Sequence, residues 1–201
     1  MSQLHDTKQR LLNTAQDLFY ARSYEDVGVQ EICQQAGVKK GSFYHFFPSK
    51  RDLVIAMLDA SWNQFRETIL RDAFAIDIPP LKRIQRLLEL QYRHHTETRD
   101  KTGHVFGCPF GNLAGEMSAQ DEVIRQRLKD ILSDFQVPIE RTLSEAVAAG
   151  ELAEIDTHTA AAAMVAYIEG LSLMAKTNND PAVIRQLGPA ILGLAAQPEK
   201  V

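Results

Sequence analysis

Residues 37–50 read GVKKGSFYHFFPSK, and this stretch decides the fold. Gly37 follows a short helical run from Val29 to Ala36, and glycine readily takes the left-handed conformation that ends a helix. A second short helix over residues 41–47 must stop at Pro48, because proline cannot continue a helix. Two short helices joined by a tight turn predict a helix-turn-helix.

The flanking sequence completes an N-terminal domain over residues 1–50. Apolar residues recur at helical spacing between residues 7 and 22 and predict a helix there. A helix-turn-helix is too small to bury its own apolar face, so we expect this first helix to cover it. Ser49 and Asp52 form a capping box that opens a long helix to about Phe74.

Residues 51–201 predict a second helical domain. Gly and Pro are sparse and fall between periodic stretches, as at the turn over residues 77–80. A capping box of Ser118 and Asp121 and a cap at Asp156 open two of its helices. Helices are expected over about 81–99, 108–117, 121–149, 156–176 and 181–196, with a loop at 100–104. The predicted fold class is all-α with about nine helices.

Composition narrows the function classes. The net charge is −4, but residues 1–50 carry +1 and the remainder −5. Charge attraction is screened beyond roughly 10 Å, so an acidic total does not exclude DNA as a partner. No apolar run is long enough to predict a membrane span, and residues 1–6 show no signal pattern. With two cysteines, Cys33 and Cys108, we expect reduced thiols and a cytoplasmic protein.

Residues 7–58 resemble the N-terminal domain of the TetR family of transcriptional regulators. The resemblance runs through LFYARSYEDVGVQEICQQAGVKKGSFYHFFPSKRDLVIAML, residues 18–58. It implies a transcriptional regulator, usually a repressor, that binds double-stranded palindromic operator DNA as a homodimer. A dimer is expected because a single helix-turn-helix offers too little contact for specific binding, so two copies bind half-sites about 34 Å or a multiple of it apart.

The resemblance also assigns the DNA-binding residues. A recognition helix presents its N-terminal turn to base edges, where the helix dipole also favours phosphate. Lys39 or Lys40 would donate to guanine or to phosphate, and both readings stay open. The expected DNA-binding residues are Gln30, Lys39, Lys40, Gly41, Ser42, Tyr44, His45 and Lys50.

Some positions near the turn have another expected role or depart from the family. Phe43, Phe46 and Phe47 are expected in the core rather than on DNA. Many family members have Ser or Thr where Val27 and Gly28 stand, so the chain lacks a phosphate-binding hydroxyl there.

The last two helices are the expected dimer interface. Residues 156–196 are rich in Ala and Gly, which allow close approach of helices. The resemblance implies a four-helix bundle across a twofold axis. The alternative is that these helices only fill the core of a monomer.

The middle helices are expected to enclose an effector. Aromatic and methionine side chains suit an apolar ligand as a set, whereas any one of them taken alone is better explained as core. The candidate lining residues are Trp62, Phe65, Tyr92, Phe106, Phe110, Leu113, Met117, Met164, Tyr167 and Leu171.

Cys108 begins the predicted helix over 108–117, where the helix dipole would lower the pKa of the thiol and favour reactive thiolate. The stretch resembles the Gly-Cys branch of the family, which includes NemR-like repressors that respond to electrophiles or oxidants. Lys176 stands where such members have a lysine that can face the thiol, stabilise thiolate and trap a sulfenic acid. The alternative is that Cys108, like Cys33, is a small packed hydrophobe.

The sequence offers no constellation for catalysis, metal binding or a cofactor. His94 and His95 are adjacent, so they point to different faces of a helix, and no Ser-His-Asp spacing or glycine-rich phosphate loop occurs. We therefore expect a regulator, not an enzyme, whose effector shifts the long helix after Ser49. The rival hypothesis is a helical partner protein with a vestigial helix-turn-helix that no longer binds DNA.

Overall fold

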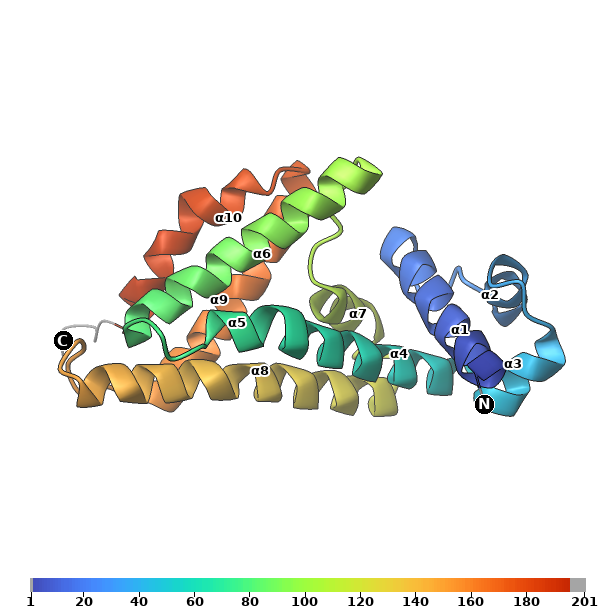
Figure 1. The fold of residues 1–201 in the computed structure, drawn as a ribbon, viewed down its shortest axis with the longest axis horizontal. Coiled ribbons are helices and arrows are strands. Elements are labelled where there is room, and N and C mark those ends of the chain that lie inside the picture. The colour runs from blue at the N-terminus through green and yellow to red at the C-terminus, as the bar shows by residue number, and fades with distance from the viewer. Residues whose placement is uncertain (1, 196–201) are drawn as a thin grey trace. The chain divides into compact units, whose positions relative to one another are not determined.

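The computed structural model describes residues 2–195, and every regular element in that range is a helix (Figure 1). A π-helix, η1 (Arg66–Leu70), joins α4 to α5, and a 3₁₀-helix, η2 (Gly188–Ala195), follows α10 directly. The α-helices are α1 (Ser2–Ala21), α2 (Val29–Gln35), α3 (Lys40–Phe46), α4 (Lys50–Phe65), α5 (Arg71–Ala73), α6 (Pro80–Thr102), α7 (Pro109–Met117), α8 (Glu122–Ala148), α9 (Thr157–Asn178) and α10 (Ala182–Leu187). The described residues thus form nine continuous helical segments, which confirms the all-α prediction. Within the same range, no helix combines the length and apolarity needed to cross a bilayer.

Several helix ends form where local chemistry predicts them. Gly37 has φ +62°, the left-handed conformation that follows α2. The Ser49 hydroxyl accepts the Asp52 N–H at 3.2 Å and donates to the Asp52 carboxylate at 2.7 Å, which closes the capping box. Asp156 accepts the Thr159 N–H at 3.1 Å and caps α9. These ends are therefore set by residues next to them in sequence.

Other helix ends correct the sequence prediction. α6 continues through the expected loop at 100–104 until Gly103 (φ +80°), because no residue before that glycine breaks a helix. α8 is capped by Asp121, which accepts the N–H groups of residues 123 and 124, so the predicted box with Ser118 is wrong. The last helix changes to 3₁₀ at Gly188, next to Pro189, whose nitrogen carries no hydrogen to donate.

The chain folds into two compact units. Of the described residues, the first unit contains 2–64 and 112–129, and the second contains 65–111 and 130–195. α4 and the first turns of α8 therefore group with the helix-turn-helix. The domain boundary expected at residue 50 stays a prediction.

The first unit is built on the core of the helix-turn-helix. Leu11 and Ala15 of α1 are completely buried, as are Ile32 of α2, Phe43 of α3 and Leu53 of α4. α1 packs on α2, and α2 packs on α3. The apolar stripe of α1 thus covers the two short helices, as their size requires.

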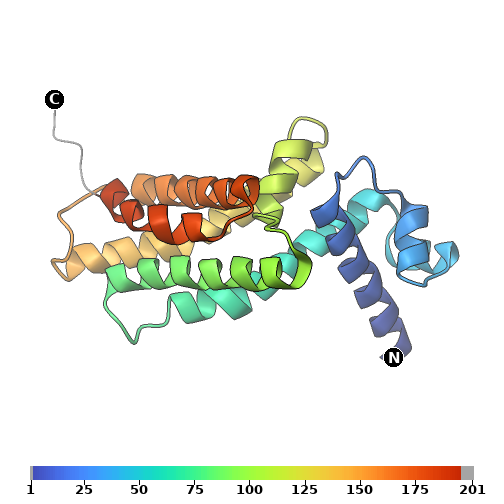
Figure 2. The same cartoon turned by 90° about the horizontal axis from the view of Figure 1, so that it is seen from above.

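In the second unit, α10 and η2 pack against both α6 and α9 (Figure 2). Asn179 ties the C-terminal ends of α6 and α9 together: its side chain accepts the Val105 N–H at 2.8 Å and donates to the Gly103 carbonyl at 3.0 Å. Arg83 of α6 is buried and forms an ion pair with Glu145 of α8 at 2.5 Å. These polar contacts fix the register of the helices around the second core.

Candidate nucleic-acid interface and effector site

The N-terminal turn of α3 lies at the surface of the first unit. Lys39 is extended (φ −69°, ψ 143°) and precedes α3, and both Lys39 and Lys40 are exposed. Tyr44 is 47% exposed, whereas Phe43 is fully buried. α3 therefore buries one face and presents the other, with two lysines at its leading end. The segment from Lys39 to Tyr44 is the short exposed helix that the sequence predicts.

The remaining predicted DNA-binding residues of α2 and α3 lie at or near the same surface. Gln30 and His45 are exposed, and Ser42 is half-buried. A side chain at Gly41 would meet no atom of this protein within 4 Å, so the backbone there is open to a partner. These placements leave the DNA contacts of all four residues as proposals.

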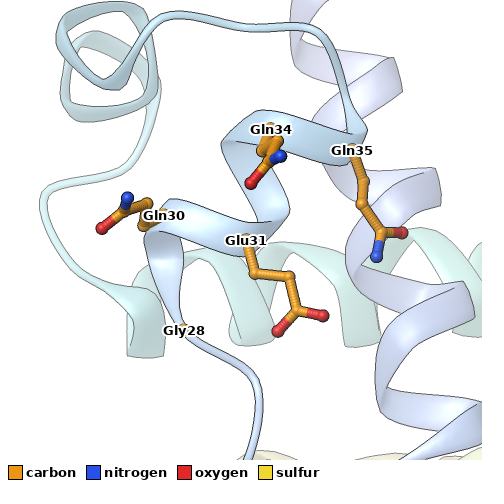
Figure 3. A pocket seen from close by; sticks show the side chains of 5 residues that line it. All are labelled: Gly28, Gln30, Glu31, Gln34 and Gln35. Carbon is orange, nitrogen blue, oxygen red and sulfur yellow. The ribbon is translucent and has the colours of Figure 1, made fainter.

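A groove of about 700 Å³ runs along α2 next to Gln30 (Figure 3). Gly28, Glu31, Gln34 and Gln35 complete its lining, so every side chain that lines the groove ends in a polar group. Its acidic residue, Glu31, is paired with Arg22 at 2.6 Å. That ion pair reduces the repulsion that Glu31 would exert on an approaching phosphate.

Lys50 has a partner inside the protein. Its ammonium donates to the Tyr24 carbonyl and lies 3.9 Å from the centroid of the Tyr24 ring. Burial lowers the pKa of Lys50, while the nearby carboxylates of Glu25 and Glu116 raise it. Lys50 thus fixes the loop between α1 and α2, and its expected phosphate contact stays a prediction.

Two arginines that the sequence analysis missed position the helix-turn-helix. Arg10 of α1 donates to the carbonyls of Ala36 and Gly37, the latter at 2.9 Å. Arg22 bonds the Asp26 carbonyl at 2.7 Å as well as Glu31. A cation at the C-terminal end of α2 stabilises the helix dipole and the exposed carbonyls. The spacing of basic residues along residues 8–22 does not predict these contacts, because their partners lie in other segments of the chain.

The predicted effector-lining residues do not all belong to one unit. Trp62, Leu113 and Met117 lie in the first unit and are buried. In the second unit, Phe110, Met164 and Leu171 are buried, whereas Phe65, Tyr92, Phe106 and Tyr167 are partly exposed.

Two of these aromatic residues contact α10. The Tyr167 hydroxyl donates to the Leu187 carbonyl at 2.8 Å. The guanidinium of Arg185 lies 3.6 Å from the centroid of the Tyr92 ring and also pairs with Glu89 at 2.6 Å. Both tyrosines thus hold α10 in place, and their contact with an effector stays a prediction.

Cys108 lies directly before α7, but its thiol is not activated as expected. Burial and the Glu169 carboxylate raise the pKa of Cys108 well above the ordinary thiol value. Hydrogen bonds from the backbone N–H groups of Gly111 and Phe110 lower it, but by less. The predicted lowering of this pKa is therefore wrong, because desolvation outweighs the helix N-terminus.

Two glycines flank Cys108 and receive side chains from α9. A Cβ at Gly111 would collide with Glu169 Oε2, and a Cβ at Gly107 would lie 3.2 Å from Lys176 Cδ. Glu169 is the carboxylate that forms a hydrogen bond with the Cys108 thiol, and burial raises the pKa of Glu169. Lys176 packs its methylenes over Gly107 and is exposed, so its predicted action on the thiol stays a prediction.

Comparison with known proteins gives matches over most of the chain. Residues 11–57 match the family model described as "Bacterial regulatory proteins, tetR family". Residues 80–191 match the model described as "Tetracyclin repressor-like, C-terminal domain". The two matches divide the chain into an N-terminal and a C-terminal part.

Individual relatives agree with these matches. The transcriptional regulator AcuR of Cereibacter sphaeroides is 34% identical over 175 residues, which cover 86% of this chain and 78% of that protein. The crystal structure of a regulatory protein TetR from Rhodobacter sphaeroides has a TM-score of 0.80 and 31% identity, covering 94% of this chain and 98% of its own.

The similarity to NemR is narrower. The NemR repressor of Escherichia coli is 37% identical over 65 residues, which cover 32% of this chain and 33% of NemR. The crystal structure of reduced E. coli NemR has a TM-score of 0.78 at 22% identity and covers 96% of this chain and all of its own. The latter similarity establishes a common fold.

Proposed function

Since the chain belongs to the TetR family of bacterial transcriptional regulators, which bind DNA through a helix-turn-helix, we propose that it is a repressor of a palindromic operator. It binds as a homodimer and is released by a small effector or by modification of Cys108. The exposed leading end of α3 carries the proposal, because it presents Lys39 and Lys40 while Phe43 anchors the helix from behind. This geometry suits insertion of α3 into a major groove.

The DNA contacts follow from what each exposed side chain offers. Lys39 and Lys40 donate to guanine edges or phosphate oxygens. Tyr44 and His45, one turn further along α3, donate to the sugar-phosphate backbone. Gln30 adds an uncharged donor from α2, beside Glu31, whose charge Arg22 balances.

The proposed dimer interface is an exposed stripe of α9 with neighbouring residues of α10 and η2. Small residues at 162, 163, 166 and 170 make this face of α9 flat, and Leu173 is 61% exposed at its end. A Cβ at Gly170 or at Gly193 would meet no atom within 4 Å. Leu187 and Leu194 are also exposed. An apolar face of this kind favours burial against a second copy of the chain.

Release from DNA requires that a change at the proposed effector site alter the position of the helix-turn-helix. α7 begins beside Cys108 in the second unit and ends in the first, where Glu116 accepts the Glu25 N–H at 3.3 Å. Arg127 of α8 pairs with Asp59 of α4 at 2.6 Å. Within the first unit, displacement of α7 would act on the loop before α2 through the Glu116–Glu25 hydrogen bond, and the Arg127–Asp59 pair holds α8 to α4.

Binding to DNA fragments from the protein's own promoter region tests the proposal. Anisotropy should show salt-dependent binding of a dimer to a palindrome and much weaker binding to a scrambled fragment. Equal, salt-independent affinity for both fragments, or none for either, would instead favour the rival partner protein with a vestigial helix-turn-helix.

The proposed release through Cys108 is tested by adding a thiol-reactive electrophile to the complex of the protein with operator DNA. Loss of operator binding in the wild type but not in Cys108→Ser supports control through the thiol. Identical responses of the two proteins would remove the covalent route and leave a non-covalent effector.

A further inference from the structure

Lys8 occupies a position on α1 where an apolar residue would extend the core. The stripe of α1 that covers the helix-turn-helix includes Leu11 and Ala15, both completely buried, and Leu12, which is 7% exposed. Residues three and four apart on a helix share one face, so Lys8 lies on the same face as Leu11 and Leu12. The buried stripe therefore continues, one turn before Leu11 and Leu12, into a cation.

The ammonium group of Lys8 lies beside the C-terminal end of α3. Its Nζ is 5.9 Å from the centroid of the Phe47 ring, and Phe47 is the residue that follows the last turn of α3. Phe47 is 3% exposed, whereas Lys8 is exposed. The Lys8 side chain thus passes the edge of a buried ring and holds its charge at the surface.

The charge of Lys8 is not neutralised within the protein. No described residue forms an ion pair or a hydrogen bond with Lys8. By contrast, each of the three arginines in residues 2–64 is paired with a carboxylate, and Lys50 donates to a backbone carbonyl. Lys8 therefore resembles Lys39 and Lys40, which are exposed and also form no ion pair with any described residue.

Lys8 lies at the opposite end of α3 from Lys39 and Lys40. Phe47 follows Lys40 by seven residues, so at 1.5 Å per residue the two ends of α3 are roughly 10 Å apart. A major groove is about 12 Å wide and is bordered on both sides by the sugar-phosphate backbone. With the leading end of α3 inserted, its far end lies near the border of the groove, and Lys8 places a cation there.

We propose that Lys8 binds a phosphate at the border of the major groove and fixes the orientation of α3 within it. This inference rests on the proposed insertion of α3 and adds a contact from outside the two short helices. A phosphate contact carries no sequence information, so Lys8 strengthens binding to any DNA sequence. No ion pair or hydrogen bond to a described residue has to break when the ammonium group meets the phosphate.

The salt dependence of DNA binding by Lys8→Met provides the test. Methionine keeps an unbranched side chain beside Phe47 and removes the charge. Each phosphate contact contributes about 0.9 to the slope of log affinity against log salt concentration, and a dimer contains Lys8 twice. The slope of Lys8→Met should therefore be smaller by about 1.8, which equals about 12-fold less loss of affinity between 50 and 200 mM salt.

Fluorescence anisotropy with operator and scrambled fragments measures these slopes and separates a phosphate contact from a base contact. In Lys8→Met, the ratio of the two affinities should stay at the wild-type value, because every sequence offers the same phosphates. A lower ratio would overturn the inference, since Lys8 would then contact a base. Lys8→Gln is the second neutral variant, and it should give the same result if Lys8→Met is poorly folded by circular dichroism.

Two variants serve as matched controls. Lys8→Arg keeps the charge and should keep the wild-type slope. Lys129 is an exposed lysine of α8 in the same unit, and Lys129→Met should also leave the slope unchanged. A slope that falls in either control as much as in Lys8→Met would overturn the inference, because side-chain packing or total charge would then be the cause.

The same titrations separate the inference from the proposed function. An unchanged slope in Lys8→Met, together with a smaller slope after replacement of Lys39 and Lys40 by alanine, would overturn the inference and leave the proposed insertion of α3 intact. Absence of binding by the wild type to either fragment would refute the proposed function and the inference together.

Discussion

Removing Lys39 and Lys40 should change how salt weakens operator binding. Both lysines are exposed at the leading end of α3, whereas Lys50, Arg10 and Arg22 have partners inside the protein. Each phosphate contact contributes about 0.9 to the slope of log affinity against log salt concentration. A dimer presents both lysines twice, so Lys39→Ala with Lys40→Ala should reduce that slope by up to about 3.6. Between 50 and 200 mM salt, this equals about 150-fold less loss of affinity.

Fluorescence anisotropy with a labelled operator at four salt concentrations measures this slope. Lys82→Ala with Lys129→Ala removes the same charge from exposed positions on α6 and α8 and serves as the control. A smaller reduction, near 1.8, with loss of discrimination between operator and scrambled DNA, would place one lysine on a base edge. An unchanged slope, or an equal change in the control, would refute the placement of α3 on DNA.

Three further predictions concern stability and assembly. Burial lowers the pKa of His95 from 6.5 to about 4, so the unfolded chain binds the proton more tightly than the folded one and the free energy of unfolding falls as pH drops below 6.5. Urea unfolding should show a loss of about 2 kcal/mol between pH 7.5 and 5 in the wild type and no such loss in His95→Gln. The same pH profile in the variant as in the wild type would contradict this. Arg10→Ala leaves the Ala36 and Gly37 carbonyls at the end of α2 without their donor and should destabilise the first unit by about 2 kcal/mol, measured by thermal unfolding. If the variant melts at the same temperature as the wild type, the contact does not contribute to stability. Leu173→Glu should yield monomers in sedimentation, whereas Val137→Glu, at an equally exposed position on α8, should leave a dimer; dimers in both would place the interface elsewhere.

The exposed surface of α3 that we propose for DNA binding could largely be predicted, because it depends on neighbours in sequence. Gly37, Pro48 and the Ser49–Asp52 box fix the ends of the short helices, and the apolar spacing decides that Phe43 faces inward. Exposure of Lys39 and Lys40 follows from the same periodicity. Lys50 is the exception. It was predicted to contact phosphate, but its ammonium donates to the Tyr24 carbonyl, which lies in a loop that sequence spacing cannot place beside it.

The surroundings of Cys108, the proposed effector site, depend on interactions between distant parts of the chain. Sequence alone placed Cys108 at a helix N-terminus and suggested Lys176 as its charged neighbour, whereas the fold brings Glu169 to the thiol. The pKa of Cys108 is raised instead of lowered because burial, and after it the Glu169 carboxylate, act on the thiol only once the chain has folded and Glu169 lies against Gly111.

By itself, the sequence determined the all-helical class, the helix-turn-helix and the face of α3 that is exposed, because helix periodicity and end signals act over a few residues. Only the tertiary structure decided which charged groups meet: Arg10 with the end of α2, Lys50 with Tyr24, and Glu169 with Cys108. Burial and electrostatic interactions depend on distances in space, and residues 61 positions apart become neighbours only when the helices pack.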